Sequence, residues 1–140
     1  MPAPFATTAE IAAARPAVWS VLTDVARWPE WTDSVEWVDL HGPALALGVS
    51  AVVRQPRLPV ATWTVTALDP GRSFTWVTRA GGVRTTGFHV LGDLPDGRTL
   101  FRTGVEQRGL PAPAVRLLLG GLTRRYLQME ADGLRRRCES

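Results

Sequence analysis

The sequence predicts a single α+β domain over residues 1–140, in which a seven-stranded antiparallel sheet curls around one long C-terminal helix. Three observations lead to this fold class. The length suits one domain, apolar residues alternate with polar ones between about residues 35 and 109, and beyond Pro113 they recur at three- and four-residue spacing. An antiparallel sheet with one exposed face needs its other face covered, and only the C-terminal helix is large enough to cover it.

The N-terminal part of the chain predicts one strand followed by two short helices. Residues 4–12 carry no helical period and are consistent with a first strand. Pro16 stands at a typical first position of a helix, and the apolar residues after it recur with helical spacing up to Asp24. Trp28 and Trp31 follow three residues apart in a second short helix, where we expect them to close one end of the gap between the sheet and the long helix.

Six further strands are expected from the alternation of apolar residues and from turn signals. The predicted strands and hairpins are residues 34–42, residues 48–56, a hairpin over 61–82 turning at Asp69-Pro70-Gly71, and a hairpin over 82–109 turning near Asp96-Gly97. Because each strand follows the last through a short connection, the six should form an antiparallel meander.

The C-terminal helix is expected to turn one stripe of residues toward the sheet. The predicted stripe is Val115, Leu118, Leu119, Leu122, Tyr126, Met129 and Gly133. Gly120 and Gly121 lack side chains where alanine would be more stable in a helix. This pair indicates a bound ligand or a close backbone approach, and a packing adjustment or kink is the alternative.

The start of the chain and its apolar runs bear on location. MPAPFATTAE has neither a basic leader nor a continuous apolar stretch, so we expect no secretory signal and a cytoplasmic location. The longest apolar run, around Leu117 to Leu122, is far too short to cross a bilayer, and no membrane insertion is expected.

Charge and metal-binding residue types argue against several classes of partner. All sixteen basic residues are arginines spread along the chain, and the net charge is only +3, which favours a solvated basic surface over a nucleic-acid partner. One cysteine, Cys138, and two histidines, His41 and His89, give no zinc-type spacing. We therefore expect no metal and no cofactor.

Four segments carry a resemblance to a known family. The segments are ARWPEW after the first helix, RQPRLPVATWTV, the hairpin ALDPGRSFTW and the closing helix LTRRYLQMEADGLRRRC. With the order of elements, they resemble the START-related helix-grip (SRPBCC) superfamily, and within it the polyketide cyclase/dehydrase and lipid-transport branch. The resemblance implies a helix-grip fold with an internal cavity between sheet and long helix. Such proteins include aromatase/cyclases, lipid carriers and hormone receptors, so function has to be argued from side chains.

Strand alternation predicts which side chains line this cavity. Neighbours on a strand face opposite ways, and the apolar set should face inward. The predicted apolar wall is Trp63, Phe74, Trp76, Phe101 and Met129, with Trp31, Gly121 and Leu122 also expected at the ligand; the polar minority is Gln55, Thr85, His89, Thr103, Gln107 and Tyr126. A largely apolar pocket with a few convergent polar groups is the usual form of a small-molecule site.

His89 and Tyr126 are the candidates for catalysis. An imidazole can act as general acid or base near neutral pH, and His89 can equally be a core histidine bonded to Thr103 or Tyr126. The Tyr126 phenol can hydrogen-bond a ligand carbonyl or a strand residue. No nucleophile with a base and an acid, and no pair of carboxylates, is expected on inward positions, so hydrolysis is disfavoured. Cys138 follows three arginines that could lower its pKa, but it lies close to a chain end.

Three functions remain open from the sequence. The first is binding of a small hydrophobic partner, such as a lipid, polyketide or aromatic metabolite, in the cavity. The alternative is a polyketide cyclase/dehydrase-type enzyme that uses His89 to transfer protons during ring closure and loss of water. The second alternative is a protein-interaction module whose core aromatics fill the cavity.

Overall fold

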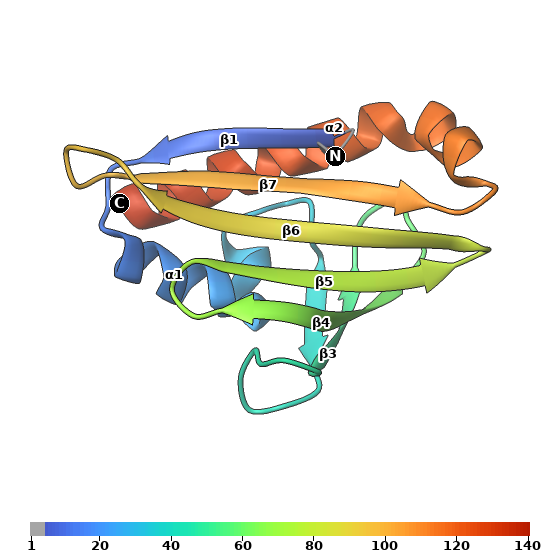
Figure 1. Ribbon diagram of the computed structural model, residues 1–140, viewed down its shortest axis with the longest axis horizontal. Helices are drawn as coiled ribbons and strands as arrows, with labels where there is room; N and C mark the ends of the chain where they lie inside the picture. The colour runs from blue at the N-terminus through green and yellow to red at the C-terminus, as the bar shows by residue number, and fades with distance from the viewer. Residues whose placement is uncertain (1–4) are drawn as a thin grey trace.

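The computed structural model describes residues 5–140 as one antiparallel sheet with a long C-terminal helix, shown in Figure 1. The strands are β1 (Phe5–Ile11), β2 (Trp37–Leu40), β3 (Ser50–Arg54), β4 (Ala61–Asp69), β5 (Ser73–Ala80), β6 (Val83–Asp93) and β7 (Thr99–Arg108). The helices are α1 (Arg15–Thr23), the 3-10 helix η1 (Val25–Glu30) and α2 (Ala112–Glu139). This confirms the predicted helix-grip arrangement, with two short helices after the first strand.

The first and last strands are neighbours in the sheet. The strand order is β1-β7-β6-β5-β4-β3-β2, and β1 pairs antiparallel with β7 from Phe5↔Val105 to Ile11↔Thr99. Helix α2 packs mainly on β1 and β7, and Figure 1 shows it running beside them. The helix therefore lies against one side of the curled sheet, which leaves the strands β3 to β6 without direct backbone contact to it.

Both predicted hairpin turns are present and depend on glycine. Gly71 connects β4 to β5 with φ 80°, and Gly97 connects β6 to β7 with φ 83°. These angles lie in the left-handed region, which costs a residue with a side chain more than it costs glycine. The turns fix the register of the two hairpins and so the face on which each side chain lies.

The first tryptophan-rich segment is packed between the sheet and α2. Trp28 donates from its indole Nε1 to the Leu22 carbonyl at 2.9 Å, and its ring lies 5.4 Å from that of Trp76 on β5. The Trp31 carbonyl faces Gly133 of α2, where an added Cβ would lie 2.0 Å from that oxygen. The helix can approach η1 this closely only because position 133 has no side chain.

The predicted stripe of α2 is partly wrong. Leu118 is 80% exposed, whereas Glu130 and Leu127 are buried. The α2 residues that line the cavity are Val115, Leu119, Thr123, Tyr126, Leu127 and Glu130, and the predicted Gly133 is buried as well. Apolar residues occur on most sides of the N-terminal turns of α2, so several inward stripes fitted the sequence equally well. At some positions the observed stripe uses a residue next to the predicted one, such as Glu130 in place of Met129. None of the helices in residues 5–140 is long and apolar enough to cross a membrane.

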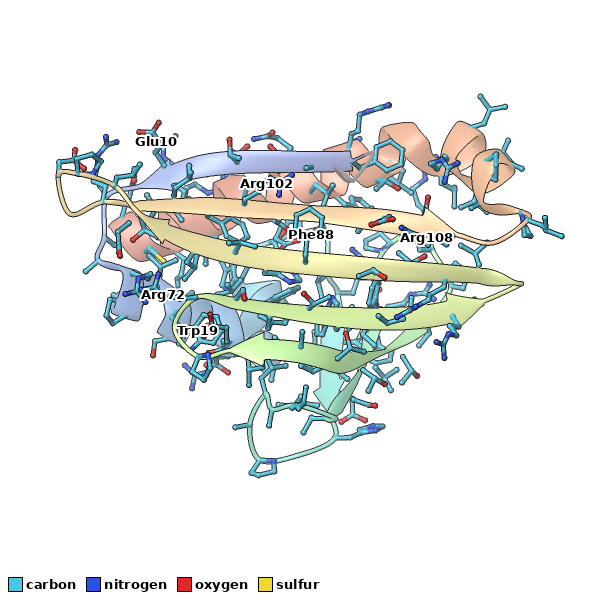
Figure 2. All side chains as sticks on the ribbon, in the orientation of Figure 1. Glu10, Trp19, Arg72, Phe88, Arg102 and Arg108 are labelled. Atoms are coloured by element: carbon cyan, nitrogen blue, oxygen red, sulfur yellow. The ribbon has the colours of Figure 1, made fainter. Side chains whose placement is uncertain are left out.

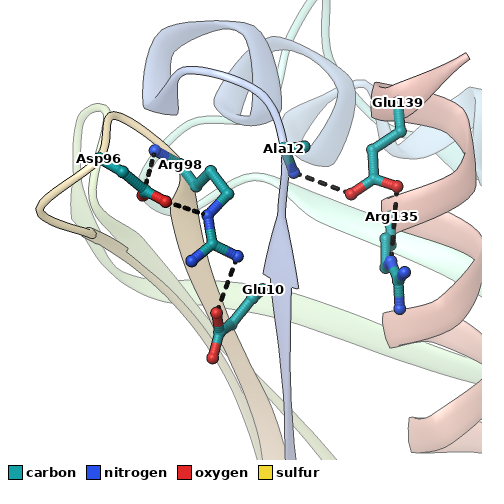
Figure 3. A network of polar contacts seen from close by, with 6 residues as sticks. All are labelled: Glu10, Ala12, Asp96, Arg98, Arg135 and Glu139. Atoms are coloured by element: carbon teal, nitrogen blue, oxygen red, sulfur yellow. Dashed lines mark hydrogen bonds and ion pairs between the residues drawn. The ribbon is translucent and has the colours of Figure 1, made fainter.

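Polar contacts join the C-terminal end of α2 to the start of the chain, as Figure 3 shows. Glu139 accepts a hydrogen bond from the Ala12 backbone N–H at 2.8 Å, which holds the pKa of this carboxyl below its ordinary value. Nearby, Arg98 donates to Asp96 at 2.6 Å and to Glu10 at 2.9 Å, and so connects the β6–β7 turn to β1. The hydrogen bond to Arg98 likewise lowers the pKa of Asp96.

We predict that Glu139→Gln makes stability less dependent on pH in the acid range. A carboxyl whose pKa is lower in the folded state stabilises the fold above its unfolded pKa, near 4.5, and loses that contribution as the pH falls through the folded pKa. Thermal unfolding should therefore show a lower Tm for the variant at neutral pH and equal Tm values at a pH well below 4.5. A constant difference across the whole range would contradict this account.

We also predict that Gly133→Ala destabilises the protein by about 1–3 kcal/mol, because its Cβ would force the helix and the Trp31 carbonyl apart. Gly121→Ala is the matched control. An added Cβ at Gly121 meets nothing within 4 Å, so this change should stabilise the helix by up to about 1 kcal/mol. Urea unfolding of both variants measures the two effects, and equal stability of both would disprove the proposed close contact.

Candidate functional site

A cavity of about 630 Å³ lies between the inner face of the sheet and α2. Strands β3 to β7, the β3–β4 loop, η1 and α2 all contribute to its wall. Its aromatic side chains are Trp28, Trp63, Trp76 and Tyr126, and its polar groups include Gln55, Thr78, Thr85, His89, Thr103, Gln107, Thr123 and Glu130. The volume is that of an ordinary small-molecule site, and the lining has the expected mixture of apolar surface and a few polar groups.

Strand register arranges the wall in three rows. Across β5, β6 and β7 the innermost row is Phe74, His89 and Thr103, of which only His89 and Thr103 line the cavity. The middle row is Trp76, Gly87 and Val105, and the outer row is Thr78, Thr85 and Gln107. Successive rows are two residues apart, about 7 Å along a strand. The cavity therefore has polar groups at its inner end, an apolar middle, and polar groups again toward the outer end.

The middle row is apolar because Gly87 makes room for indoles. An added Cβ at Gly87 would lie 3.0 Å from Trp76 Nε1 and 3.4 Å from the Trp63 ring. The rings of Trp63 and Trp76 are themselves 5.5 Å apart and tilted by only 32°. The two indoles thus cover the strand at this point and form a broad aromatic surface on the cavity wall.

The innermost polar group is a buried histidine–glutamate pair. His89 Nε2 lies 3.2 Å from Glu130 Oε1, and both side chains are largely buried. Thr103 Oγ1 donates to the same carboxyl oxygen at 3.4 Å. The imidazole stacks on the Phe74 ring with 4.2 Å between centroids and an angle of 12°. This packing and these contacts fix the plane of the imidazole and the position of the carboxyl group.

The hydrogen-bond partners constrain where the protons of this pair lie. His89 Nδ1 is 3.4 Å from the Phe74 carbonyl, which can only accept, so this nitrogen is best assigned a proton. The contact between Nε2 and Glu130 then needs a second proton, held either by the imidazole or by the carboxyl. In both cases the pair carries no net charge, which is the least costly state to bury. A single proton placed between Nε2 and Oε1 satisfies both atoms.

Glu130 is a residue that sequence reasoning missed. The predicted stripe passed through Met129 and did not include Glu130, which was not named among the candidate site residues. The spacing Leu119, Thr123, Leu127, with Tyr126 beside it, continues to Glu130 at three or four residues and was the available signal. The partners suggested for His89, Thr103 and Tyr126, are replaced by Glu130 and a backbone carbonyl.

Tyr126 lines the cavity, and its hydroxyl donates to the carbonyl of Pro56 in the β3–β4 loop. The phenol therefore joins α2 to this loop across the cavity. The hydroxyl therefore donates within the protein rather than to a ligand carbonyl. Its oxygen can still accept a hydrogen bond.

The structure brings most of the other predicted residues to the cavity, although their roles stay predictions. Gln55, Trp63, Trp76, Thr85, Thr103 and Gln107 line it together with His89 and Tyr126. Six predicted residues do not line it: Trp31, Phe74, Phe101, Gly121, Leu122 and Met129.

Packing explains why these six lie elsewhere. Phe74 and Phe101 point inward as predicted but are fully buried in the core beyond the inner end of the cavity, and Trp31 is packed against α2. Gly121 and Leu122 border a separate hollow between α2 and the β3–β4 loop. Met129 is half-buried beside the inward stripe.

Cys138 is not a candidate nucleophile. Burial, reinforced by the neighbouring Glu139 carboxylate, raises the pKa of its thiol to about 11, against a smaller opposite effect of Arg137. The three arginines before it, which could have lowered the pKa, are outweighed by burial. A thiol with such a pKa is almost entirely protonated near neutral pH and therefore a weak nucleophile.

Comparison with known proteins assigns the fold and the family. The sequence matches a family model described as polyketide cyclase / dehydrase and lipid transport over residues 2–139. A comparison with curated proteins found no match. Among solved structures, a hypothetical protein of Helicobacter pylori has a TM-score of 0.83 at 15% identity, covering 96% of this chain and 86% of that one.

Two further structures agree in fold. A START superfamily protein of Mycobacterium smegmatis has a TM-score of 0.72 at 17% identity, over 96% of this chain and 95% of that one. The di-domain ARO/CYC StfQ from the steffimycin biosynthetic pathway has a TM-score of 0.68 at 19% identity, over 96% of this chain and 44% of that one. Likeness at these identities shows the fold alone. The family match spans nearly the whole sequence, and this chain therefore belongs to the polyketide cyclase/dehydrase and lipid transport family of the START-related superfamily.

Proposed function

We propose that this protein binds a small hydrophobic molecule in the cavity between the sheet and α2. The observation that carries the proposal is the 630 Å³ cavity with an indole-covered middle and a buried polar pair at its inner end. A lipid, a polyketide or another aromatic metabolite has the apolar surface that such a wall would bury. The family description and the ARO/CYC relative support the same classes of ligand.

The arrangement of polar rows favours a particular shape of ligand. A flat or elongated apolar body fits against Trp63 and Trp76, with an oxygen function at the inner end facing His89 and Glu130. A second polar group would meet Thr85 and Gln107 at the outer row, where the Gln107 amide oxygen is buried without a hydrogen-bond partner in residues 5–140. A cavity of this volume also disfavours the interaction module with a filled core. The cytoplasmic location expected from the sequence stays a prediction.

A second candidate function is acid–base catalysis, and the His89–Glu130 pair favours it. The pair can give its shared proton to a ligand carbonyl oxygen while it accepts a proton from the adjacent carbon, so that an enol forms and the pair is unchanged in charge. Aldol closure and loss of water both begin with such proton transfers. Phe74 and Thr103 would act as positioning residues that hold the two reacting groups.

We predict that Thr123→Trp weakens uptake of the neutral probe N-phenyl-1-naphthylamine by about tenfold or more, because the indole would occupy the cavity. Arg136→Trp adds the same side chain to the exposed face of α2 and should bind the probe like the parent protein. Fluorescence titration gives the affinities, and thermal unfolding checks that both variants fold. Equal affinity of the two variants would argue against the cavity as the binding site.

For the second candidate we predict that the protein accelerates exchange of the α-protons of α-tetralone in deuterated water, followed by proton NMR. Glu130→Gln keeps size and hydrogen bonding but has no proton to transfer, so the acceleration should fall by about 10²–10⁴-fold. Thr8→Val, a change on the exposed face of β1, should leave it intact. If α-tetralone binds and no acceleration is seen in the parent protein, catalysis is excluded for this ketone while the binding proposal stands.

A further inference from the structure

Exposed leucines gather where the polypeptide enters α2. Leu110, Leu117 and Leu118 are 99%, 85% and 80% exposed, and Val60 in the neighbouring β3–β4 loop is 47% exposed. Val60, Gly81 and Val115 line the cavity, and Leu118 lines a second hollow that shares Leu119 with it, so the exposed leucines lie beside the outer end of the cavity. Single exposed leucines are common on protein surfaces, but several on one end indicate a surface that is covered in use.

The same end of the molecule is strongly basic. From Arg108 to Arg125 the chain contains four arginines and no acidic residue. Arg57, Arg79 and Arg84 belong to the loop and strands that meet there, and in the described part of the chain none of the three has a carboxylate partner. The acidic residue nearest in sequence, Glu106, is already paired with Arg108 at 2.6 Å. At the opposite end, Arg15, Arg98 and Arg137 are paired with carboxylates, although within residues 5–140 Arg72 and Arg136 are not.

In Figure 2, Arg108 lies toward the end of the sheet where α2 begins, and Glu10 and Arg72 lie at the other end. The small net charge of +3 therefore conceals an uneven distribution along the long axis. Long-range attraction to a negatively charged surface would orient the molecule with the cavity mouth toward that surface.

A second hollow joins the leucines to the arginines. It has a volume of about 440 Å³ and is lined by Arg57, Leu118, Leu119, Gly121, Leu122 and Arg125. Its only charged groups are two guanidinium groups, and Leu119 also borders the main cavity. Arg57 has a φ of 67°, the only left-handed non-glycine residue among those described. Such strain is retained where a side chain must be held in a given direction, and here the strained residue lines a hollow suited to a phosphate group.

We propose that this end of the molecule docks on an anionic phospholipid membrane. We call it the mouth surface, and it comprises Val60, Leu110, Leu117, Leu118, Arg57, Arg79, Arg84 and Arg125. The leucines would enter the boundary of the acyl chains, and Arg57 with Arg125 would hold a lipid phosphate in the 440 Å³ hollow. The exposed apolar side chains suit the acyl chains at a bilayer surface, and the unpaired arginines around them suit its anionic headgroups. An acidic protein would account for the arginines but leave the leucines uncovered.

Docking in this orientation places the cavity mouth against the bilayer. A hydrophobic ligand could then pass between the membrane and the cavity without crossing water. This consequence rests on the proposed binding function, whereas docking itself depends only on the mouth surface. The arginine contribution should weaken with added salt, and the leucine contribution should not.

The test is co-sedimentation with vesicles of phosphatidylcholine, with and without phosphatidylglycerol. We expect binding to the anionic vesicles and little to the neutral ones. Leu117→Asp combined with Leu118→Asp should weaken binding by about tenfold or more, and so should Arg57→Gln combined with Arg125→Gln. The matched controls are Leu47→Asp, an exposed leucine in the β2–β3 loop, and Arg72→Gln combined with Arg136→Gln, two exposed arginines at the far end. Both controls should bind as the parent protein does.

Several results would overturn the proposal. Absence of binding to anionic vesicles would do so, as would equal losses in the control variants, or binding that depends on the arginines but not on the leucines. Light scattering that shows a dimer abolished by the leucine changes, without vesicle binding, would assign the surface to a second copy of the chain. Uptake of N-phenyl-1-naphthylamine distinguishes the docking proposal from the ligand-binding proposal. If the protein binds vesicles but takes up no probe, the docking proposal stands and the ligand-binding proposal fails.

Discussion

The close packing of α2 against the segment after η1 determines the rest of this structure. In the C-terminal half of the helix, the Trp31 carbonyl leaves no room for a side chain at Gly133. The N-terminal half is also held at the sheet, since Arg116 donates to the Gln107 carbonyl at 3.1 Å and an added Cβ at Gly120 would lie 3.2 Å from Phe5. The helix contacts mainly β1 and β7, so the cavity lies over the other strands, and Glu130, near the close contact, lines its inner end.

The buried pair is placed by the same geometry. Glu130 lies three residues before Gly133, so the close approach that needs the glycine also brings the carboxyl within 3.2 Å of His89. Each of the two buried polar groups needs the other as its partner, since either one left alone would be buried without it. The polar chemistry of the site and the packing of the helix are thus one arrangement, and a shift of α2 along its axis would disturb both.

Strand patterns predicted more of the site than the helix pattern did. A strand offers two faces, and Arg84 on one face of β6 was enough to assign Thr85 and His89 to the other, with Thr103 and Gln107 paired to them across the sheet. Successive residues of a helix point about 100° apart, so many choices of inward face are possible. The leucines near the start of α2 were compatible with several of these choices. The chosen rotation passed through Met129 and hid Glu130. The alternation along a strand also could not predict how far the cavity extends. It shows which residues point inward, but it does not distinguish a residue on the cavity wall from a core residue such as Phe74.

The pairing of β1 with β7 has a consequence for how the chain reaches this state. Phe5 and Val105 are partners across the sheet although they stand near opposite ends of the sequence. Contacts between residues so far apart cost the most loop-closure entropy and form late. During synthesis β1 cannot pair until β7 has been made. Until then its Phe5, which packs near Gly120 of α2 in the folded protein, remains exposed. The short β1 segment is therefore the part of this protein most in need of protection before folding is complete.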